Sequence, residues 1–182
     1  TRWLTTSADE TVTIPTGGGE EITDFDFVID WGDGTIEKYS GLDDPDPSHT
    51  YASADTHTVS ITGIFPHMDP VEEGKLDQLV SLENWGTIEW EKMDRMFAWG
   101  INMEYNATDV PDLSKVTDVR GMFFNTPKFN GDLSDWDVSN VERMESMFFK
   151  AVSFNSDISS WNVSNVTNMQ SMFSEASSFN AD

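Results

Sequence analysis

The chain has 182 residues with 33 acidic and 10 basic side chains, which give a formal net charge of −23 at pH 7, and 37% of its residues are hydrophobic. This hydrophobic content is enough for a folded core, whereas the negative charge repels phosphate backbones and anionic lipids, so nucleic acids and bare membranes are poor partners. The absence of cysteine excludes disulfides, cysteine-based zinc sites and thiol nucleophiles.

Residues 1–70 are predicted to form the first domain, a small all-β sandwich of antiparallel strands. Three stretches, 11–14, 25–29 and 58–61, alternate between apolar and polar residues as half-buried strands do. After the second stretch, Asp33-Gly34 predicts a tight hairpin turn, because Gly accepts the positive φ that such a turn requires.

The same segment carries a sequence signature. Residues 28–35 read Val-Ile-Asp-Trp-Gly-Asp-Gly-Thr, residues 49–51 read His-Thr-Tyr, and residues 58–61 read Thr-Val-Ser-Ile. In this order they resemble the core of polycystic-kidney-disease (PKD)-type domains. The resemblance implies an immunoglobulin-like fold for the first domain.

An acidic loop in this domain is a candidate metal site. Asp43, Asp44 and Asp46 lie close together in the chain, and carboxylates are the oxygen ligands that calcium prefers. The sequence has no EF-hand frame, so we expect either calcium in this loop or no cofactor at all. Asp30 and Asp33 are instead expected to shape their turn through side-chain bonds to the backbone.

Residues 71–110 are predicted to be a divergent capping coil. Leu76, Leu79 and Leu82 begin an apolar face, and the interval from Phe97 to Phe123 is one position longer than the repeat that follows. We expect this segment to cover the N-terminal end of a repeat array.

The sequence of residues 111–182 recurs every 25 residues, in copies at 111–135, 136–160 and 161–182, and the last copy is shorter. The residues in phase include Trp136 and Trp161, Met144 and Met169, Met147-Phe148 and Met172-Phe173, and Phe154-Asn155 and Phe179-Asn180. A fixed period with apolar residues in phase predicts a solenoid whose coils bury their apolar faces against one another. Because the last copy stops short of a full repeat, we expect a piece of a longer array, in which neighbouring repeats of the same chain are partners.

Each coil is predicted to contain one short helix and one short strand. In the second copy, the apolar residues of the helix are Val141, Met144, Met147, Phe148 and Ala151. Their spacing of three and four residues places them on one side of a helix, and Ser139 with Glu142 fits a capping box at its start. Residues 154–158 alternate as a strand does. This is the plan of an α/β leucine-rich-repeat solenoid.

The motif at 136–158 reads Trp-x-Val-Ser-x-Val-x-x-Met-x-x-Met-Phe-x-x-Ala-x-x-Phe-Asn-x-Asp-Ile. It is similar to the repeat of BspA-like leucine-rich-repeat surface proteins of bacteria. The resemblance covers residues 79–182, and the pairing with a PKD-like domain is also similar to that family. It implies a secreted or cell-surface protein that serves in adhesion or ligand binding.

Two columns of polar residues recur on the predicted strands and are the candidate ligand-binding residues. They are Asn130, Asp132, Asn155, Asp157, Asn180 and Asp182. If they share an exposed face, they could hold a cation, a sugar hydroxyl or a basic side chain. Alternatively, the Asn side chains satisfy backbone groups at each bend, since buried polar groups are regularly paired.

The sequence therefore predicts a non-enzymatic adhesion module that binds a protein or glycan of a host or neighbouring cell on the strand face, with affinity that accumulates over several coils. The alternative is a structural spacer of a large surface protein, with no ligand of its own. No apolar run is long enough to cross a bilayer as a helix, so we expect no direct insertion into a membrane.

Overall fold

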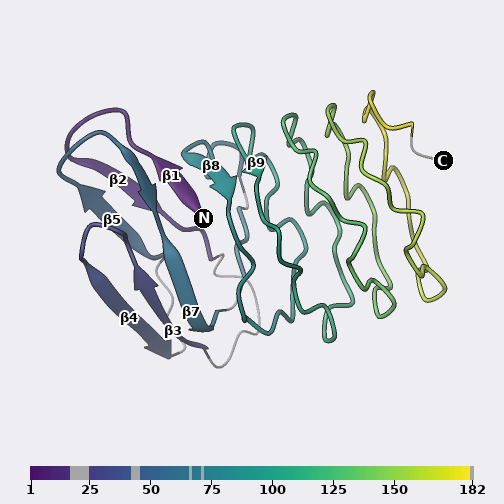
Figure 1. Ribbon diagram of the computed structural model, residues 1–182, viewed down its shortest axis with the longest axis horizontal. Helices are drawn as coiled ribbons and strands as arrows, with labels where there is room; N and C mark the ends of the chain where they lie inside the picture. Colours follow the sequence, from purple (N-terminus) through teal and green to yellow (C-terminus); the bar gives the residue numbers. More distant parts are fainter. Residues whose placement is uncertain (17–24, 42–45, 66, 71, 181–182) are drawn as a thin grey trace.

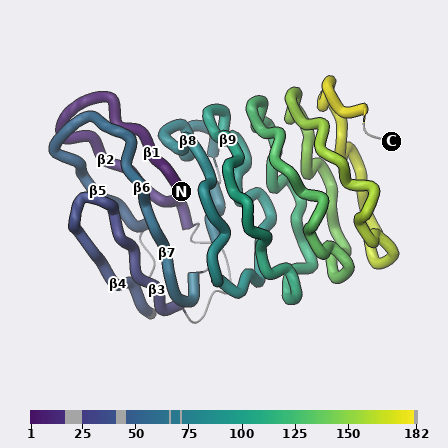
Figure 2. Tube along the Cα trace, in the orientation of Figure 1, coloured from purple at the N-terminus to yellow at the C-terminus, as the bar shows by residue number. Residues whose placement is uncertain are grey.

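The computed structural model describes residues 1–16, 25–41, 46–65, 67–70 and 72–180. The molecule is elongated, with most of its strands at the N-terminal end (Figure 1). Successive coils of backbone follow one another along the long axis toward the C-terminus (Figure 2). The described residues form nine strands and no helix, so the fold is all-β.

Two antiparallel sheets form most of the N-terminal end. In the first, β3 (Phe25–Asp30) lies between β4 (Ile36–Gly41) and β7 (Ser60–Ile64), and in the second, β2 (Glu10–Thr13) pairs with β5 (Ser48–Tyr51). The predicted strands at 11–14 and 25–29 correspond to β2 and β3. Their alternating apolar side chains, such as Val12, Phe27 and Ile29, are fully buried, as the pattern of period two requires.

A third sheet joins the N-terminal end to the coils. Its strands, in order, are β6 (Thr56–Thr58), β1 (Arg2–Leu4), β8 (Leu79–Leu82) and β9 (Glu104–Tyr105). β1 is antiparallel to both of its neighbours, whereas β8 and β9 are parallel, because they belong to successive coils. The predicted strand at 58–61 is divided at Val59 between β6 and β7. This sheet combines strands from before and after residue 70, the predicted end of the first domain. The domain limits at residues 70 and 110 remain predictions.

The hairpin between β3 and β4 has a longer loop than the tight turn predicted from the sequence. Its five residues are closed by the Trp31 N–H, which donates to the Thr35 carbonyl at 3.0 Å. Asp30 and Asp33 each accept the backbone N–H two residues further on, at 2.9 Å, so they shape the turn as expected. The hydrogen bonds from Thr35 and from His49 lower the pKa of Asp33 to about 2.

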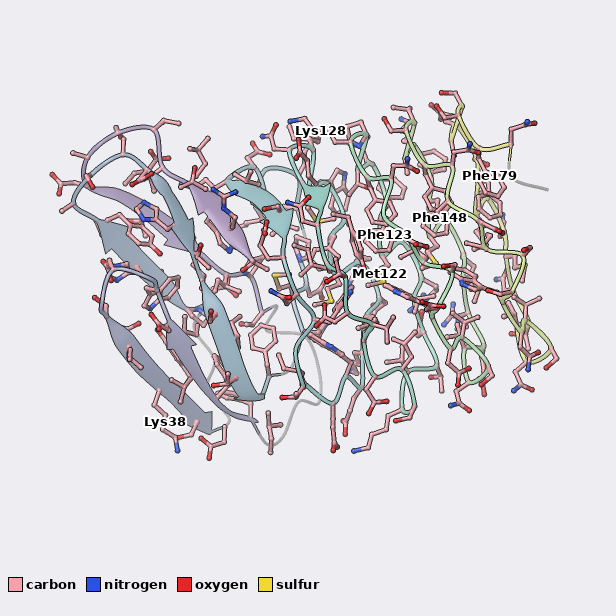
Figure 3. The ribbon with its side chains drawn as sticks, in the orientation of Figure 1. Lys38, Met122, Phe123, Lys128, Phe148 and Phe179 are labelled. Carbon is pink, nitrogen blue, oxygen red and sulfur yellow. The ribbon has the colours of Figure 1, made fainter. Side chains whose placement is uncertain are left out.

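The coils stack in register, with equivalent phenylalanine rings above one another. The rings of Phe123, Phe148 and Phe173 form a column with centroids 5.8 and 5.7 Å apart and nearly parallel planes. A second column contains Phe129, Phe154 and Phe179, at 5.8 and 5.5 Å. Figure 3 shows how the labelled rings follow the long axis. Each copy of the sequence repeat is therefore one coil.

The helix predicted in each coil is wrong, and consecutive tight turns take its place. The Met147 N–H donates to the Met144 carbonyl, and the Phe149 N–H donates to the Ser146 carbonyl, so these bonds span three residues and not four. Ser146 and Lys150 have positive φ angles of 55° and 59°. A left-handed residue at every fourth position interrupts a right-handed helix, which needs negative φ throughout.

Other N–H groups of these turns reach the next coil. We call residues 92–99, 118–125, 143–150 and 168–175 the turn strips. The Phe123 N–H donates to the Met147 carbonyl and the Phe148 N–H to the Met172 carbonyl, both at 2.9 Å, and alternate residues along the first three strips repeat this bond. The backbone is thus paired between coils, as in a sheet. The α/β leucine-rich-repeat fold predicted from the sequence is therefore wrong.

Two further features of the predicted coil are not found. The Ser139 N–H donates to Asp137 Oδ1 at 3.1 Å and the Glu142 N–H to the Thr117 carbonyl at 2.8 Å, so Ser139 and Glu142 do not form a capping box. Residues 154–158 are not in a strand. Their coils are connected instead by bonds between side chains and backbone, which are described below.

Candidate functional site

The turn strips lie side by side and form one face of the coil stack, which we call the turn face. A groove with a volume of about 440 Å³ lies on this face and is lined by residues of three successive coils. Its aromatic and charged lining residues are Asp94, Arg95, Trp99, Arg120, Phe124 and Glu145. The groove therefore brings aromatic rings, guanidinium groups and carboxylates together.

Half-buried aromatic rings form a stripe along the turn face, and two of them, Trp99 and Phe124, line the groove. The ring centroids of Trp99 and Phe124 are 5.5 Å apart in an edge-to-face arrangement, and those of Phe124 and Phe149 are 4.8 Å apart with planes 9° from parallel. Phe123 and Phe148, one residue earlier in the chain, are fully buried. Each Phe-Phe pair thus gives one ring to the core and one to the turn face, where the faces of Phe124 and Phe149 cover each other.

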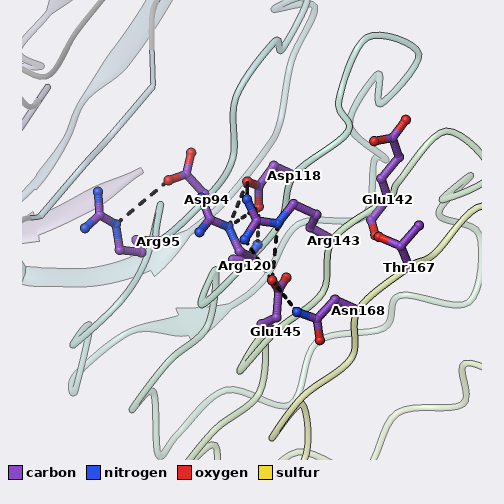
Figure 4. Close-up of polar contacts among 9 residues, drawn as sticks. All are labelled: Asp94, Arg95, Asp118, Arg120, Glu142, Arg143, Glu145, Thr167 and Asn168. Carbon is purple, nitrogen blue, oxygen red and sulfur yellow. Dashed lines mark hydrogen bonds and ion pairs between the residues drawn. The ribbon is translucent and has the colours of Figure 1, made fainter.

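Arg120 retains hydrogen-bond donors. Its Nε donates to both carboxylate oxygens of Asp118, at 2.9 and 2.8 Å (Figure 4). Its two terminal nitrogens make no hydrogen bond to the described residues. The hydrogen bond to Asp118, together with the nearby charges of Asp94 and Glu145, raises the pKa of Arg120. The guanidinium is therefore a permanent donor in the groove.

Glu145 contributes a carboxylate to the wall of the same groove. Its Oε1 accepts hydrogen bonds from Arg143 Nη2 at 2.8 Å and from Asn168 Nδ2 at 2.7 Å (Figure 4). Its Oε2 is buried and has no hydrogen-bond partner among the described residues. Burial opposes ionisation of this carboxyl, but the hydrogen bond and charge of Arg143 outweigh that cost, and the pKa of Glu145 is lowered. Because Oε2 is enclosed by protein atoms, it is not presented to a ligand in the groove.

Arg95 connects the groove with a buried pair of titratable groups. Its Nη2 donates to Asp69 Oδ2 at 3.0 Å, and Asp69 is only 7% exposed. His67 is 5% exposed, and within the described residues neither its Nδ1 nor Asp69 Oδ1 has a hydrogen-bond partner. Burial lowers the pKa of His67, although the charges of Asp69 and Asp94 oppose this.

The low pKa of His67 predicts a loss of stability in mild acid. Because the folded protein keeps this imidazole neutral, its contribution is present above the ordinary pKa of 6.5 and is lost as the pH falls below that value toward the folded pKa. We expect the unfolding free energy of the unchanged protein to fall by up to about 1.4 kcal/mol per pH unit more steeply than that of His67→Gln in this range. Urea unfolding of both proteins between about pH 8 and pH 5 measures the difference. Equal slopes would contradict the lowered pKa.

The turn face also differs in charge from the rest of the molecule. The turn strips contain five basic residues, Lys92, Arg95, Arg120, Arg143 and Lys150, and four acidic residues, Asp94, Asp118, Glu145 and Glu175. Half of the 10 basic residues of the chain are therefore in these strips, with only four of its 33 acidic residues. The turn face is close to neutral on a protein of net charge −23.

The Asn residues of the predicted ligand-binding columns connect successive coils. Asn130 Oδ1 accepts the backbone N–H of Asn155, and Asn155 Oδ1 accepts the backbone N–H of Asn180, both at 2.8 Å. All three residues are exposed. This ladder of amide side chains replaces a ladder of strand hydrogen bonds along that edge of the stack. The alternative in which Asn satisfies backbone groups describes these contacts, and a role in ligand binding remains a prediction.

The Asp residues of the columns make local bonds. Asp132 Oδ1 accepts the backbone N–H of Ser134 at 3.0 Å, and Asp157 Oδ1 accepts that of Ser159 at 2.9 Å. These bonds lower the pKa of both carboxyls, and both side chains are exposed. Asp182 lies outside the described residues. The structure brings these columns together on one edge but places none of them among the groove residues.

Replacing Asn155 by Ala is expected to cost about 1 kcal/mol of stability, because the Asn180 N–H loses its acceptor. Urea unfolding measures this cost, and Ser153→Ala, an exposed change in the same coil, is the control. If Asn155→Ala instead leaves stability unchanged and abolishes capture of a ligand, the column and not the groove is the binding site.

The calcium prediction can be compared with the structure at one residue. Asp46 Oδ1 accepts the backbone N–H of Thr16 at 2.9 Å. Asp43 and Asp44 lie outside the described residues, and calcium in their loop remains a prediction. Among the residues that the structure describes, no group of three or more His, Asp or Glu side chains is arranged to hold a metal ion.

Sequence reasoning missed the groove, although two signals for it were present. Phe124 and Phe149 recur in phase with the repeat, and the core needs only one ring of each Phe-Phe pair. The basic residues also gather in the turn strips of an otherwise acidic chain. A residue that repeats in phase but is not needed for the core indicates a surface with a function of its own.

Residues 91–182, which contain all four turn strips, match the model of a family described as "Mycoplasma protein of unknown function, DUF285". The chain belongs to this family. The DUF285 match corrects the resemblance to BspA-like leucine-rich-repeat proteins with an N-terminal PKD-like domain: another family matches, the match does not include residues 1–90, and the described residues contain no helix for a leucine-rich repeat. No curated protein and no solved structure matches the chain. In its described part, the DUF285 chain has no helix long and apolar enough to cross a bilayer.

Proposed function

We propose that the chain is a non-enzymatic binding module of a secreted or cell-surface protein and that it captures a protein or glycan in the groove. The observation that carries the proposal is the combination of two partly exposed rings, Trp99 and Phe124, with the terminal nitrogens of Arg120, which have no hydrogen-bond partner among the described residues. A few polar groups directed at an apolar platform are the usual composition of a ligand site.

The rigidity of the groove supports a binding role. The Arg95 N–H donates to the Arg120 carbonyl at 2.7 Å, the Trp99 N–H to the Phe124 carbonyl at 2.8 Å, and the Gly121 N–H donates to the next coil at 2.9 Å. The backbone under every groove side chain is therefore fixed before a ligand arrives. Pre-organisation of this kind reduces the entropy lost on binding.

The electrostatics of the groove favour binding over catalysis. A carboxyl that works as a general acid near neutral pH needs a raised pKa, whereas the pKa of Glu145 is lowered by its bonds to Arg143. Glu145 therefore stays ionised and serves as an acceptor. The hydroxyl of Ser146, which also lines the groove, has no hydrogen bond to a base among the described residues.

Replacing both Trp99 and Phe124 by Leu is expected to weaken ligand capture at least about fivefold, because each aromatic ring contributes about 0.5–1.5 kcal/mol. Capture by the unchanged protein is first measured on an array of oligosaccharides and proteins, and the affinity of each ligand found is then compared with that of the double variant. Leu retains apolar bulk, so the fold is expected to persist, which a thermal melt checks.

Ile36→Ala is the control, since Ile36 is 65% exposed on β4, in the sheet at the N-terminal end. Its affinity should be unchanged. An array on which the unchanged protein captures nothing would support the alternative function, a structural spacer without a ligand. Capture that the double variant retains in full would place the binding site outside the groove.

A further inference from the structure

We propose that a cavity between the third sheet and the chain that follows β8 binds a neutral, apolar small molecule about the size of a substituted benzene. This cavity is separate from the groove, because the two share no lining residue. Three properties of the cavity lead to the inference: its size, the apolar character of its walls and the charge beside it.

The cavity has a volume of about 220 Å³. Trp3 of β1 and Leu82 of β8 line it from the third sheet, and Trp85, Trp90 and Phe97 line it from the chain that follows. Protein interiors contain few voids larger than a water molecule, so a space of this size is an exception in the packing. An apolar cavity of about 150 Å³ holds benzene, and the larger volume here therefore fits a molecule of about nine or ten non-hydrogen atoms.

The walls of the cavity are apolar, because the polar atoms of its indole rings are paired or enclosed. Trp3 Nε1 donates to Thr1 Oγ1 at 2.9 Å, and Trp85 Nε1 donates to the Tyr105 hydroxyl at 2.8 Å. Trp90 Nε1 has no partner among the described residues, but protein atoms enclose it and keep it from a ligand. The other buried apolar lining residues are Ile14, Phe65, Met68, Leu82, Ile88 and Met96. The walls therefore attract a ligand through the hydrophobic effect.

The charge beside the cavity opposes an anionic ligand. Glu83 lines the cavity, and the hydrogen bonds that it accepts from Ser81 and Asn106 lower the pKa of its carboxyl. Glu83 is therefore negative at neutral pH, on a protein of net charge −23. An anion would be repelled by both and would also lose its water to apolar walls.

The arrangement of the rings disfavours a cationic ligand. Cations bind to the open faces of aromatic rings. Here Trp90 meets Phe65 and Trp85 in edge-to-face contacts, with interplanar angles of 89° and 87°. The rings thus use faces to pack on one another and do not form an open cage. A neutral apolar molecule needs no such face, since any carbon surface of the walls can contact it.

Isothermal titration of the full chain with benzene, toluene, ethylbenzene and propylbenzene tests the ligand class. We expect each added carbon to raise the affinity about fourfold, because it buries one more apolar group. In 2-phenylethylammonium an ammonium group replaces the terminal methyl of propylbenzene, and phenylacetate carries a carboxylate. Both should bind at least about tenfold more weakly than propylbenzene, because apolar walls cannot replace the water of a charged group. No binding of propylbenzene, or equal affinity for 2-phenylethylammonium, would overturn the inference.

Two variants test whether propylbenzene occupies this cavity. Ile61 lies half-buried on β7 and lines the cavity, so Ile61→Trp takes up part of the space and should weaken binding about tenfold or more. Ile64→Trp is the control, because Ile64 is 62% exposed on the same strand and does not line the cavity. Its affinity for propylbenzene should be unchanged, and a thermal melt checks that both variants fold.

Met68→Ala provides a second test that does not depend on the folding of Ile61→Trp. Met68 is buried and lines the cavity, so its truncation enlarges the space. The affinity for butylbenzene should rise about fourfold or more, since the longer chain then has room to bury its last carbon. Binding of propylbenzene and butylbenzene that neither Ile61→Trp nor Met68→Ala changes would place these ligands elsewhere and overturn the inference.

Discussion

Phe148→Ala is expected to destabilise the protein by about 4 kcal/mol, one of the largest effects of any single substitution in the coils. The ring is fully buried and lies between those of Phe123 and Phe173, with a further contact to Phe154 at 3.9 Å between centroids. Its removal leaves a cavity and interrupts the column on both sides at once. Equilibrium urea unfolding, followed by tryptophan fluorescence, measures the change.

Val152→Ala is the matched control for this substitution, since Val152 is 39% exposed in the same coil. It should change the unfolding free energy by no more than about 0.5 kcal/mol. Should Phe148→Ala cost as little as Val152→Ala, the ring column would not be what holds successive coils together.

Gly32→Ala is expected to cost on the order of 3 kcal/mol, for two separate reasons. Gly32 has a φ of +82°, which an L-residue with a Cβ rarely adopts. A Cβ at this position would also lie 2.3 Å from the Thr58 carbonyl oxygen, a backbone atom that cannot move without disturbing β6. Urea unfolding of the variant measures the sum of both effects.

Gly34→Ala separates these two effects. Gly34 has a φ of +97°, but a Cβ built there meets no atom within 4 Å. This variant should therefore cost only the backbone strain, about 1 kcal/mol. If the two variants are equally destabilised, the close approach of Gly32 to the third sheet does not contribute to the cost of Gly32→Ala.

The strands of the N-terminal end and the stacking of the coils could be predicted from the sequence because both depend on patterns of burial. The alternation at 25–29 requires a sheet with one buried face, and the fixed repeat period requires equivalent rings to stack. Phe123, Phe148 and Phe173 stack accordingly.

The helix could not be excluded by the same reasoning. Apolar residues three and four apart, such as Met144, Met147 and Phe148, result from a helix and equally from consecutive tight turns. The difference lies in the left-handed residues, and Ser146 and Lys150 are not types that signal positive φ. The previous coil has Gly121 and Asn125 at the equivalent positions, and Gly and Asn are the residue types that most readily adopt positive φ. These two residues were the sequence signal for turns in place of a helix.

The sequence interpretation took polar repetition as a sign of a ligand, placed the candidate site at the Asn and Asp columns, and did not find the groove. In Asn130 and Asn155 the polar side chain repeats because each coil needs an acceptor for the next backbone N–H. Phe124 repeats without such a need, and it meets Glu145 in the groove only when two successive coils are brought together. Contacts between coils are not visible in the sequence of any one repeat.

Backbone amide NMR of the ¹⁵N-labelled chain, titrated with the ligand that binds most tightly on the array of oligosaccharides and proteins, tests the central claim most directly. The account predicts that chemical-shift changes concentrate in the turn strips, around Trp99, Phe124 and Glu145, and leave Asn130 and Asn155 unaffected. Changes that concentrate around Asn130 and Asn155, with none in the turn strips, would contradict it.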